Sequence, residues 1–290
     1  MGILFTSDIS HWQAEIDSSD RADLVKALEA GQIVSLPSLS FALLEFEQKF
    51  LSSCWLNGSR KNISLDGDSV RGAAGNPFEL QELARLMARF GAHANQLIET
   101  LFPHYAEHVR VARTSYRPAR VDHRNSTWRK DDSRLHVDAF PSRPIGGERI
   151  LRVFTNINPH GEPRVWEVGE PFADAARRFL PQIRRPLPGS ARMLAALGVT
   201  KGRRSEYDHI MLRLHDSMKA DPEYQRCATH QRIEFPPGAT WICFSDQVLH
   251  AALDGQYLLE QTLYLPVAAQ QYPEFSPLRT LERLRQRHLS

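Results

Sequence analysis

The stretch Ser133-Arg134-Leu135-His136-Val137-Asp138-Ala139-Phe140 decides our interpretation of the fold. Every second residue from position 135 to position 139 is apolar, which predicts the end of a half-buried strand. In such a strand the side chains of His136 and Asp138 point to the same face. A histidine and an aspartate placed side by side in this way can each supply one ligand to a metal ion.

A third potential ligand, His250, lies more than one hundred residues downstream. It follows an apolar stretch at residues 241–244, and residues 255–266 after it are again typical of a β-strand. Each histidine could instead be a buried, hydrogen-bonded core residue. However, two histidines and one carboxylate are the set that binds non-haem Fe(II) on one face and leaves the opposite positions open. The β-rich surroundings favour a metal site formed by His136, Asp138 and His250.

The composition is that of a globular protein with one large domain: 290 residues, of which 42% are hydrophobic. Lys and Arg number 36 and Asp and Glu number 34, and this net charge of +2 does not predict a nucleic-acid partner. The three cysteines are far apart and odd in number, which predicts no disulfide framework and a reducing compartment. No apolar run approaches the length of a membrane span. We therefore expect a cytoplasmic protein.

The first 108 residues are predicted to be mainly helical. Helices are expected over residues 18–31, 41–53 and 76–102, with a short strand over residues 32–36 and a loop around residues 58–68. The apolar residues of these helices recur on one face, and no residues typical of catalysis accompany them. The simplest interpretation is a helical buttress that packs against a sheet.

From residue 109 the chain changes to short extended stretches separated by Gly and Pro, which favours a sandwich or jelly roll over a βαβ fold. These stretches are residues 109–116, 134–140, 149–156, 164–168, 231–235, 239–244 and 257–266. Helices expected at 171–179, 190–197 and 207–218 interrupt them and could form one wall or lid of a pocket. A basic helix is expected at residues 277–289.

We therefore predict one α+β domain, mainly β, over residues 1–290. It comprises the buttress (1–108), a jelly-roll core (109–267) with a helical insertion at about 171–220, and a C-terminal tail and helix (268–290). The oligomeric state is left open.

Three segments carry a resemblance to a known family: Arg134-Leu-His-Val-Asp-Ala-Phe-Pro-Ser-Arg-Pro, Leu151-Arg-Val-Phe-Thr-Asn-Ile-Asn-Pro and Glu260-Gln-Thr-Leu-Tyr-Leu-Pro. The arrangement resembles the Fe(II)/2-oxoglutarate-dependent dioxygenases, whose core is a double-stranded β-helix. More closely, the segments are similar to the bacterial Kdo 3-hydroxylases, which act on the octulosonic acid sugar (Kdo) of lipopolysaccharide. The likeness extends from about residue 113 to residue 266.

The resemblance implies Fe(II), O2 and the cosubstrate 2-oxoglutarate, which is decarboxylated to succinate and CO2. Many members of the superfamily hold the far carboxylate of 2-oxoglutarate with a basic residue about ten positions after the second histidine, but residues 251–261 contain none. Arg152 is the best replacement, because it alternates with Leu151 and Val153 in a strand and can face the interior. An internal salt bridge to a glutamate is the alternative for Arg152.

Further cosubstrate contacts are expected from Arg117, Gln261 and Thr262, although Arg117 could also be a solvated loop residue. For an anionic Kdo substrate the resemblance implies a rim of basic residues and an aromatic side chain that stacks on the sugar. The expected substrate-binding residues are Arg120, Arg124, Arg143, Arg164 and Trp166. Ordinary core packing is the alternative for Trp166.

Trp128 and the basic C-terminal helix suit a membrane interface. For the C-terminal helix, however, a solvated helix that packs on the protein is the simpler interpretation.

The expected function is therefore hydroxylation of Kdo at carbon 3 in lipopolysaccharide or Kdo-containing lipid A. The expected location is the cytoplasm, with peripheral contact to the cytoplasmic face of the inner membrane. One alternative is a 2-oxoglutarate dioxygenase that acts on a protein or a small molecule. Another is a non-catalytic, cupin-like metal-binding module.

Overall fold

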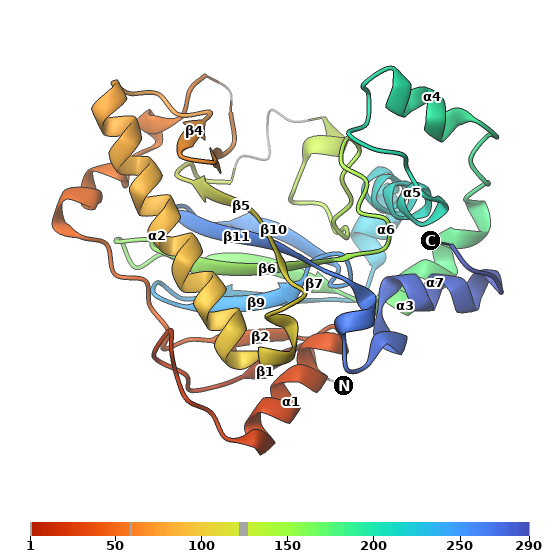
Figure 1. The fold of residues 1–290 in the computed structure, drawn as a ribbon, viewed down its shortest axis with the longest axis horizontal. Coiled ribbons are helices and arrows are strands. Elements are labelled where there is room, and N and C mark those ends of the chain that lie inside the picture. Colours follow the sequence, from red (N-terminus) through yellow and green to blue (C-terminus); the bar gives the residue numbers. More distant parts are fainter. Residues whose placement is uncertain (1, 59, 122–126, 290) are drawn as a thin grey trace.

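The computed structural model describes residues 2–58, 60–121 and 127–289 (Figure 1). Its described strands form an eight-stranded sheet in the order β1-β2-β9-β6-β11-β5-β3-β4 and a three-stranded sheet in the order β10-β7-β8. Every pairing is antiparallel except that of β1 with β2. The strands are β1 (Leu4–Thr6), β2 (Ile33–Leu36), β3 (Ile63–Asp66), β4 (Ser69–Arg71), β5 (Arg110–Arg117), β6 (Arg149–Asn156), β7 (Arg164–Gly169), β8 (His230–Phe235), β9 (Thr240–Phe244), β10 (His250–Asp254) and β11 (Leu258–Leu265).

The two sheets pack face to face through a shared apolar core. Phe154 and Trp241 of the larger sheet lie against Trp166 and Phe235 of the smaller sheet. The rings of Phe235 and Trp241 stack with their centroids 3.9 Å apart, and those of Phe154 and Trp166 meet edge to face at 5.1 Å. This arrangement confirms an α+β fold built on a large antiparallel sheet. The double-stranded β-helix connectivity and the domain boundaries stay predictions.

Two helices cover the outer face of the larger sheet, as predicted: α1 (Ser18–Glu29) and α2 (Pro77–Leu101). Asn76 caps α2 because its side chain accepts a hydrogen bond from the backbone N–H of Glu79, and the Glu79 carboxylate accepts one from the N–H of Asn76. The apolar faces of both helices pack on β6, β9 and β11. Helices α1 and α2 thus support the larger sheet, of which β1, β2, β3 and β4 of the N-terminal part are themselves members.

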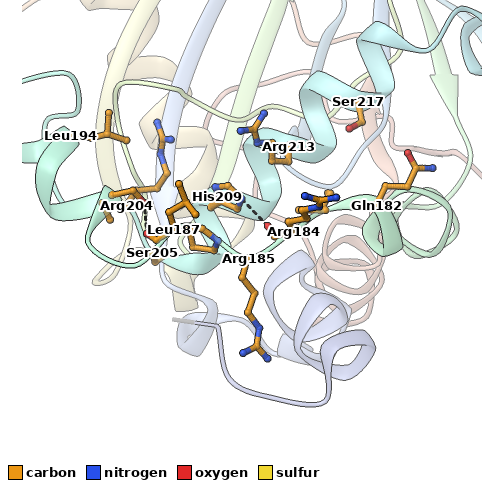
Figure 2. Close-up of a pocket in the computed structure, with 14 residues that line it drawn as sticks. Gln182, Arg184, Arg185, Leu187, Leu194, Arg204, Ser205, His209, Arg213 and Ser217 are labelled. Atoms are coloured by element: carbon orange, nitrogen blue, oxygen red, sulfur yellow. Dashed lines mark hydrogen bonds between the residues drawn. The ribbon is translucent and has the colours of Figure 1, made fainter.

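A helical insertion follows β7 and ends before β8. It contains α3 (Phe172–Phe179), α4 (Ser190–Ala196), α5 (Glu206–Ala220) and α6 (Pro222–Cys227), and α7 (Pro277–Arg285) packs against it. Their buried side chains share one core with Leu135 and Val137, which flank the first predicted metal ligand. Figure 2 shows the connection between α3 and α5, where several arginine side chains gather.

Two predicted elements are wrong. Residues 41–53 form short 3-10 helices, Glu45–Phe50 and Ser53–Trp55, in place of an α-helix. The Glu47 carboxylate explains part of this difference, because it accepts a hydrogen bond from the backbone N–H of Leu44 and pairs with Arg89 of α2. Tertiary contacts thus override local propensity at this site.

The expected strand at residues 134–140 is an extended segment outside both sheets. Its backbone forms an isolated bridge between His136 and His250 and a hydrogen bond from the Asp138 N–H to the Ser245 carbonyl. Its alternation is nevertheless as predicted, because Leu135 and Val137 are buried in the apolar core. Strands β1, β3, β4 and β10 and helix α6 were not predicted. No helix in the described part of the chain is both long and apolar enough to cross a membrane.

Candidate metal centre and its cavity

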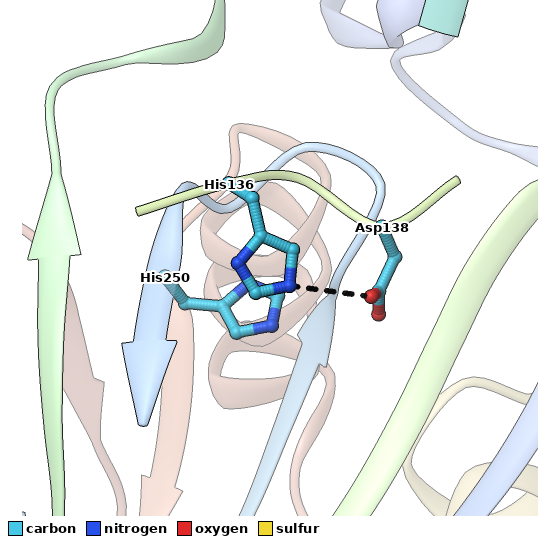
Figure 3. Close-up of side chains that lie close together, drawn as sticks. All are labelled: His136, Asp138 and His250. Carbon is cyan, nitrogen blue, oxygen red and sulfur yellow. Dashed lines mark ion pairs between the residues drawn. The ribbon is translucent and has the colours of Figure 1, made fainter. Parts of the chain in front are cut away.

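His136, Asp138 and His250 come together as predicted, with one potential ligand atom from each lying within 4.8 Å of the others (Figure 3). The extended segment at residues 134–140 lies beside the start of β10, and its bridge holds the two histidines next to each other. Their ring centroids are 4.8 Å apart. Nε2 of His136 lies 3.9 Å from Oδ1 of Asp138. Two neighbouring residues and a third more than one hundred residues away thus converge on one point.

The backbone fixes the orientation of both imidazole rings. Nδ1 of His136 lies 2.7 Å from the carbonyl oxygen of Arg134, and Nδ1 of His250 lies 2.8 Å from that of Val248. A carbonyl oxygen can only accept, so each Nδ1 carries a proton and donates it. The lone pair of each Nε2 is therefore available to a metal ion, and the carbonyl contact is the kind of support that metal-binding histidines receive.

The electrostatics of the site suit a cation. Burial lowers the pKa of His136 and of His250 below the usual histidine value, so both rings are neutral and able to bind a metal near pH 7. Burial alone would raise the pKa of the Asp138 carboxyl, but Arg152 and the two histidines hold this pKa below its usual range. The carboxylate is thus ionised. Two neutral imidazoles and one carboxylate on one side of an open space fit Fe(II).

Arg152 points into the interior, as predicted, and connects the metal site to a buried glutamate. Its Nη2 lies 3.1 Å from Oδ2 of Asp138, and its Nη1 donates to Oε1 of Glu260 at 2.6 Å. The salt bridge to a glutamate, which the sequence left as the alternative, is therefore present. Glu260 was not identified from the sequence, although alternation along β11 places it on the same face as Thr262.

Arg117 forms the second half of this charged network. Its guanidinium lies 3.3 Å from the Glu260 carboxylate and 3.7 Å from Asp132, which lies 3.5 Å from the ammonium group of Lys219. Lys219 is almost fully buried, and burial lowers the pKa of its ammonium group. Arg117 is therefore a partly buried strand residue that lines the cavity, and the solvated-loop alternative is wrong.

Arg164 differs from its neighbours, because it forms no ion pair with a carboxylate in the described part of the chain. Its side chain is 5% exposed, its Nη1 donates to the carbonyl of Gly255 at 3.1 Å, and its Nε has no partner within the described ranges. Burial, and then the nearby Arg117, lower the pKa of Arg164 to about 10. A buried cation in this situation is costly unless an anion joins it.

These side chains surround a cavity of about 530 Å³. Its basic lining residues outnumber its acidic ones by six to four, before any metal ion is counted. The basic residues are Arg117, Arg129, Lys130, Arg152, Arg164 and Lys219, and the acidic residues are Asp132, Asp138, Asp216 and Glu260. A cavity of this size and charge suits small organic anions.

Helix α5 supplies one wall of the cavity through Leu212, His215, Asp216 and Lys219. The ring of His215 meets that of His136 edge to face, with the centroids 5.2 Å apart, and its Nδ1 lies 3.1 Å from Oδ1 of Asp216. The sequence predicted that the insertion forms a wall or lid. It gave no signal for His215, because nothing in the local pattern shows which face of α5 meets the cavity.

Several residues that were predicted to bind ligands do not line the cavity. Gln261 lies on the opposite face of β11, where its side chain accepts a hydrogen bond from the Thr114 hydroxyl beneath α2, so its predicted cosubstrate role is wrong. Thr262 is on the cavity side of β11, opposite Arg152, but does not line the cavity.

Two of the predicted substrate arginines also lie outside the lining. Arg120 is half exposed and pairs with Asp254 at 2.8 Å and Glu162 at 3.2 Å, and Arg143 is partly exposed. Arg124 lies outside the described residues.

Trp166 lines the cavity, but one face of its ring is already used. The indole stacks on the His250 imidazole at 4.9 Å and is 2% exposed, which is the core packing that the sequence left as the alternative. The buried indole offers little surface for the predicted stacking on a sugar face, and this role stays a prediction. The indole Nε1–H is buried and has no partner in the described part of the chain, so it remains available as a donor.

Comparisons with known proteins identify a family for this chain. The sequence matches the family described as 3-deoxy-D-manno-oct-2-ulosonic acid (Kdo) hydroxylase over residues 11–288. No curated protein sequence matches. The chain is similar to crystal structures of the Kdo hydroxylase KdoO, a non-heme Fe(II) alphaketoglutarate dependent dioxygenase. The cobalt(II) complex is 45% identical, with 99% of this chain and 97% of that chain covered, and the TM-score is 0.96.

Two further KdoO structures carry the cosubstrate and its product. The complexes with alphaketoglutarate and Fe(III) and with succinate and Fe(III) have the same identity and coverage, each with a TM-score of 0.95. The family match spans nearly the whole chain, and the three predicted metal ligands converge as such an enzyme requires. The chain therefore belongs to the Kdo hydroxylase family of non-haem Fe(II)/2-oxoglutarate-dependent dioxygenases.

Proposed function

We propose that this protein hydroxylates carbon 3 of Kdo in Kdo-containing lipid A or lipopolysaccharide, and that it contacts the inner membrane peripherally. 2-Oxoglutarate and O2 are the cosubstrates, and succinate and CO2 are the coproducts. The observation that carries the proposal is the convergence of His136, Asp138 and His250 at the wall of a cavity in whose lining the basic side chains outnumber the acidic ones.

His136, Asp138 and His250 would hold Fe(II) by one face. The metal, when bound together with 2-oxoglutarate, supplies the activation of O2 that C–H hydroxylation needs. The protein residues keep the imidazoles neutral, fix their Nε2 atoms toward the metal position and keep the Asp138 carboxylate ionised. Trp166 supports His250 from behind by ring stacking.

The dicarboxylate cosubstrate requires cations that are not already neutralised. Arg164 meets this condition, since it has no carboxylate partner in the described part of the chain and it lines the same cavity as the metal ligands. We assign one carboxylate of 2-oxoglutarate to Arg164, with Arg117 beside it and the Trp166 N–H as a further donor. Arg152 keeps its role in cosubstrate binding, but it acts mainly by positioning Asp138 and balancing Glu260.

The sugar would enter on the side of the cavity formed by α5 and residues 129–132. Arg129, Lys130 and Lys219 line this side, and they are suited to the Kdo carboxylate. His215 lies next to His136 on the same side, close enough to contact a bound ligand. Its partner Asp216 would hold the imidazole in one orientation.

The proposal is tested with purified protein, Fe(II), ascorbate and 2-oxoglutarate, with and without Kdo-containing lipid A. Succinate should form faster with the lipid, and the lipid mass should rise by one oxygen. His136→Ala should abolish both effects, while His11→Ala, at an exposed position, should abolish neither. Succinate formation that ignores the lipid would indicate a different substrate. If no 2-oxoglutarate is turned over under any condition, the result would favour the alternative that the protein is a non-catalytic metal-binding module.

A further inference from the structure

The connection from α3 to α5 carries an unusual concentration of positive charge. Between Asp174 and Glu206 the sequence contains eight basic residues and no acidic residue. Six of the eight lie in residues 184–204, which we call the arginine arm. They are Arg184, Arg185, Arg192, Lys201, Arg203 and Arg204. None of these six forms an ion pair with a carboxylate in the described ranges. The fold itself therefore does not account for their charge.

The arginine arm also carries exposed apolar side chains. Leu187 is 78% exposed, Leu197 is 69% exposed, and Met193 and Val199 are each more than half exposed. Met193 and Leu197 are four residues apart at α4 and so lie on one side of it. Figure 1 shows α4 at the edge of the molecule, away from both sheets. Large exposed apolar residues concentrated on one peripheral segment indicate an interaction surface.

The arm also encloses a second cavity of about 530 Å³ (Figure 2). Arg184, Arg185 and Arg204 line it together with His209 and Arg213 of α5, and no acidic residue is among its lining residues. Arginine side chains in this arrangement can bind phosphate oxygens with paired N–H donors. The chemistry of this cavity therefore suits a phosphate group.

The arm is directly connected to the catalytic cavity. Nη2 of Arg204 donates to the carbonyl of Pro141 at 2.6 Å, and the N–H of Lys201 donates to the carbonyl of Ser142 at 2.9 Å. Pro141 lines the cavity of the metal centre. Helix α5 also separates the two cavities, because His215 faces the metal centre and Arg213 faces the arm. A partner bound by the arm would lie next to the active site.

We propose that the arginine arm docks the enzyme on an anionic lipid bilayer, with Leu187, Met193 and Leu197 entering the apolar boundary and the arginines binding headgroup phosphates. Arginines around aliphatic side chains are the signature of an interfacial segment. A nucleic-acid surface would instead carry aromatic side chains for base stacking, and the arm contains none. The inference rests on the proposed function for its lipid-borne substrate.

The C-terminal helix and Trp128, which the sequence suggested for this role, are less suitable. Leu278 and Leu281 of α7 are buried in the core of the insertion, so this helix has its apolar side covered. Trp128 is only partly exposed and is covered by the guanidinium of Arg129 at 4.0 Å. The arm offers both the apolar side chains and the unpaired charges.

The test is co-sedimentation of the full-length protein with vesicles of phosphatidylcholine alone and with vesicles that also contain phosphatidylglycerol. Wild type should bind only the anionic vesicles. The triple variant Arg185→Gln, Arg192→Gln, Arg203→Gln should lose roughly a hundredfold in affinity, because three charges leave the surface. The double variant Leu187→Ser, Leu197→Ser should lose roughly tenfold. All five positions are exposed, so melting temperatures should not change.

The matched control, Lys26→Gln, Arg85→Gln, Arg226→Gln, removes the same charge at exposed positions outside the arm and should bind like wild type. Equal loss in this control, or undiminished binding by either arm variant, would overturn the proposal. So would saturable binding of inorganic phosphate by a protein that ignores vesicles.

Vesicle binding can be measured without enzymatic turnover. The docking proposal and the proposed hydroxylase function can therefore be tested independently. A wild-type enzyme that binds anionic vesicles through the arm but adds no oxygen to Kdo-containing lipid A would contradict the proposed function alone. An enzyme that oxidises the lipid but binds vesicles independently of the arm would contradict the docking surface alone.

Discussion

The carboxylate of Asp138 lies 3.1 Å from the guanidinium of Arg152, so a predicted metal ligand and a predicted cosubstrate clamp form one ion pair. The same guanidinium donates to Glu260 at 2.6 Å. Arg152 of β6 pairs with Thr262 of β11, and Glu260 precedes Thr262 by two residues on the same strand. The guanidinium of Arg152 is thereby held between the carboxylates of Asp138 and Glu260. The position of the metal site thus depends on a residue that need not touch the metal.

Replacement of Arg152 should therefore affect stability and metal binding together. Arg152→Met leaves two carboxylates with fewer partners in the interior and should lower the free energy of unfolding by about 3 kcal/mol, as measured by urea denaturation. Co(II) affinity, measured by calorimetry, should fall roughly 10- to 100-fold because Asp138 loses its support. Arg110→Met, which removes the exposed pair with Glu148, should cost less than about 1 kcal/mol. Equal effects of the two variants would contradict the positioning role.

Arg164 should behave in the opposite way. Arg164→Met removes a buried cation that has no carboxylate partner within the described residues, so stability without ligands should be unchanged or higher. The KM for 2-oxoglutarate should rise roughly a hundredfold, because the cosubstrate loses a buried charged partner. Arg120→Met, in an exposed ion pair outside the cavity, should leave this KM unchanged. An unaltered KM in Arg164→Met would remove Arg164 from the cosubstrate site.

Metal binding should stabilise the folded protein. At a free Co(II) concentration one hundred times its dissociation constant, the free energy of unfolding should rise by about 2.7 kcal/mol, which is visible as a higher melting temperature. His136→Ala and His250→Ala should lose most of this increase. If Co(II) raises the melting temperature of His136→Ala as much as that of wild type, the ion binds elsewhere.

Acid stability should depend on Asp132. Burial alone would raise the pKa of the Asp132 carboxyl, but Arg117, His136 and Lys219 lower it to about 2. Because this pKa is lower in the folded than in the unfolded state, Asp132 stabilises the fold above about pH 4, and its contribution disappears as the pH falls toward 2. The loss of melting temperature from pH 5 to pH 2.5 should be smaller in Asp132→Asn than in wild type. An identical profile would exclude this contribution, and the exposed Asp68→Asn serves as the control.

The placement of His136 and Asp138 side by side could be predicted from sequence because its signal is local. His136 and Asp138 are two residues apart between buried apolar residues, and this pattern keeps its meaning even though the segment joins its neighbour by a single bridge. Arg152 could be placed in the interior for the same reason, since it alternates with apolar residues in β6. The family segments around these residues then indicated the reaction.

The remaining site residues depend on packing that local patterns do not encode. Gln261 and Thr262 are adjacent in β11, and only the pairing of Gln261 with Thr114 shows which of the two faces away from the cavity. His215 belongs to a helix whose rotation is set by the core of the insertion. Trp166 was predicted to stack on a sugar, but its place in the core is fixed by rings from three other strands and by His250.

The sharing of Glu260 between Arg117 and Arg152 ties three strands, β5, β6 and β11, to a single carboxylate. Loss of Glu260 would leave two guanidinium groups without their shared carboxylate, and loss of either arginine would remove one of the two partners of Glu260 as well as a partner of Asp138 or Asp132. During divergence these positions should therefore change together or remain as they are. Arg117, Arg152 and Glu260 should therefore covary among relatives. A relative that has lost one of these residues should show a compensating substitution at another.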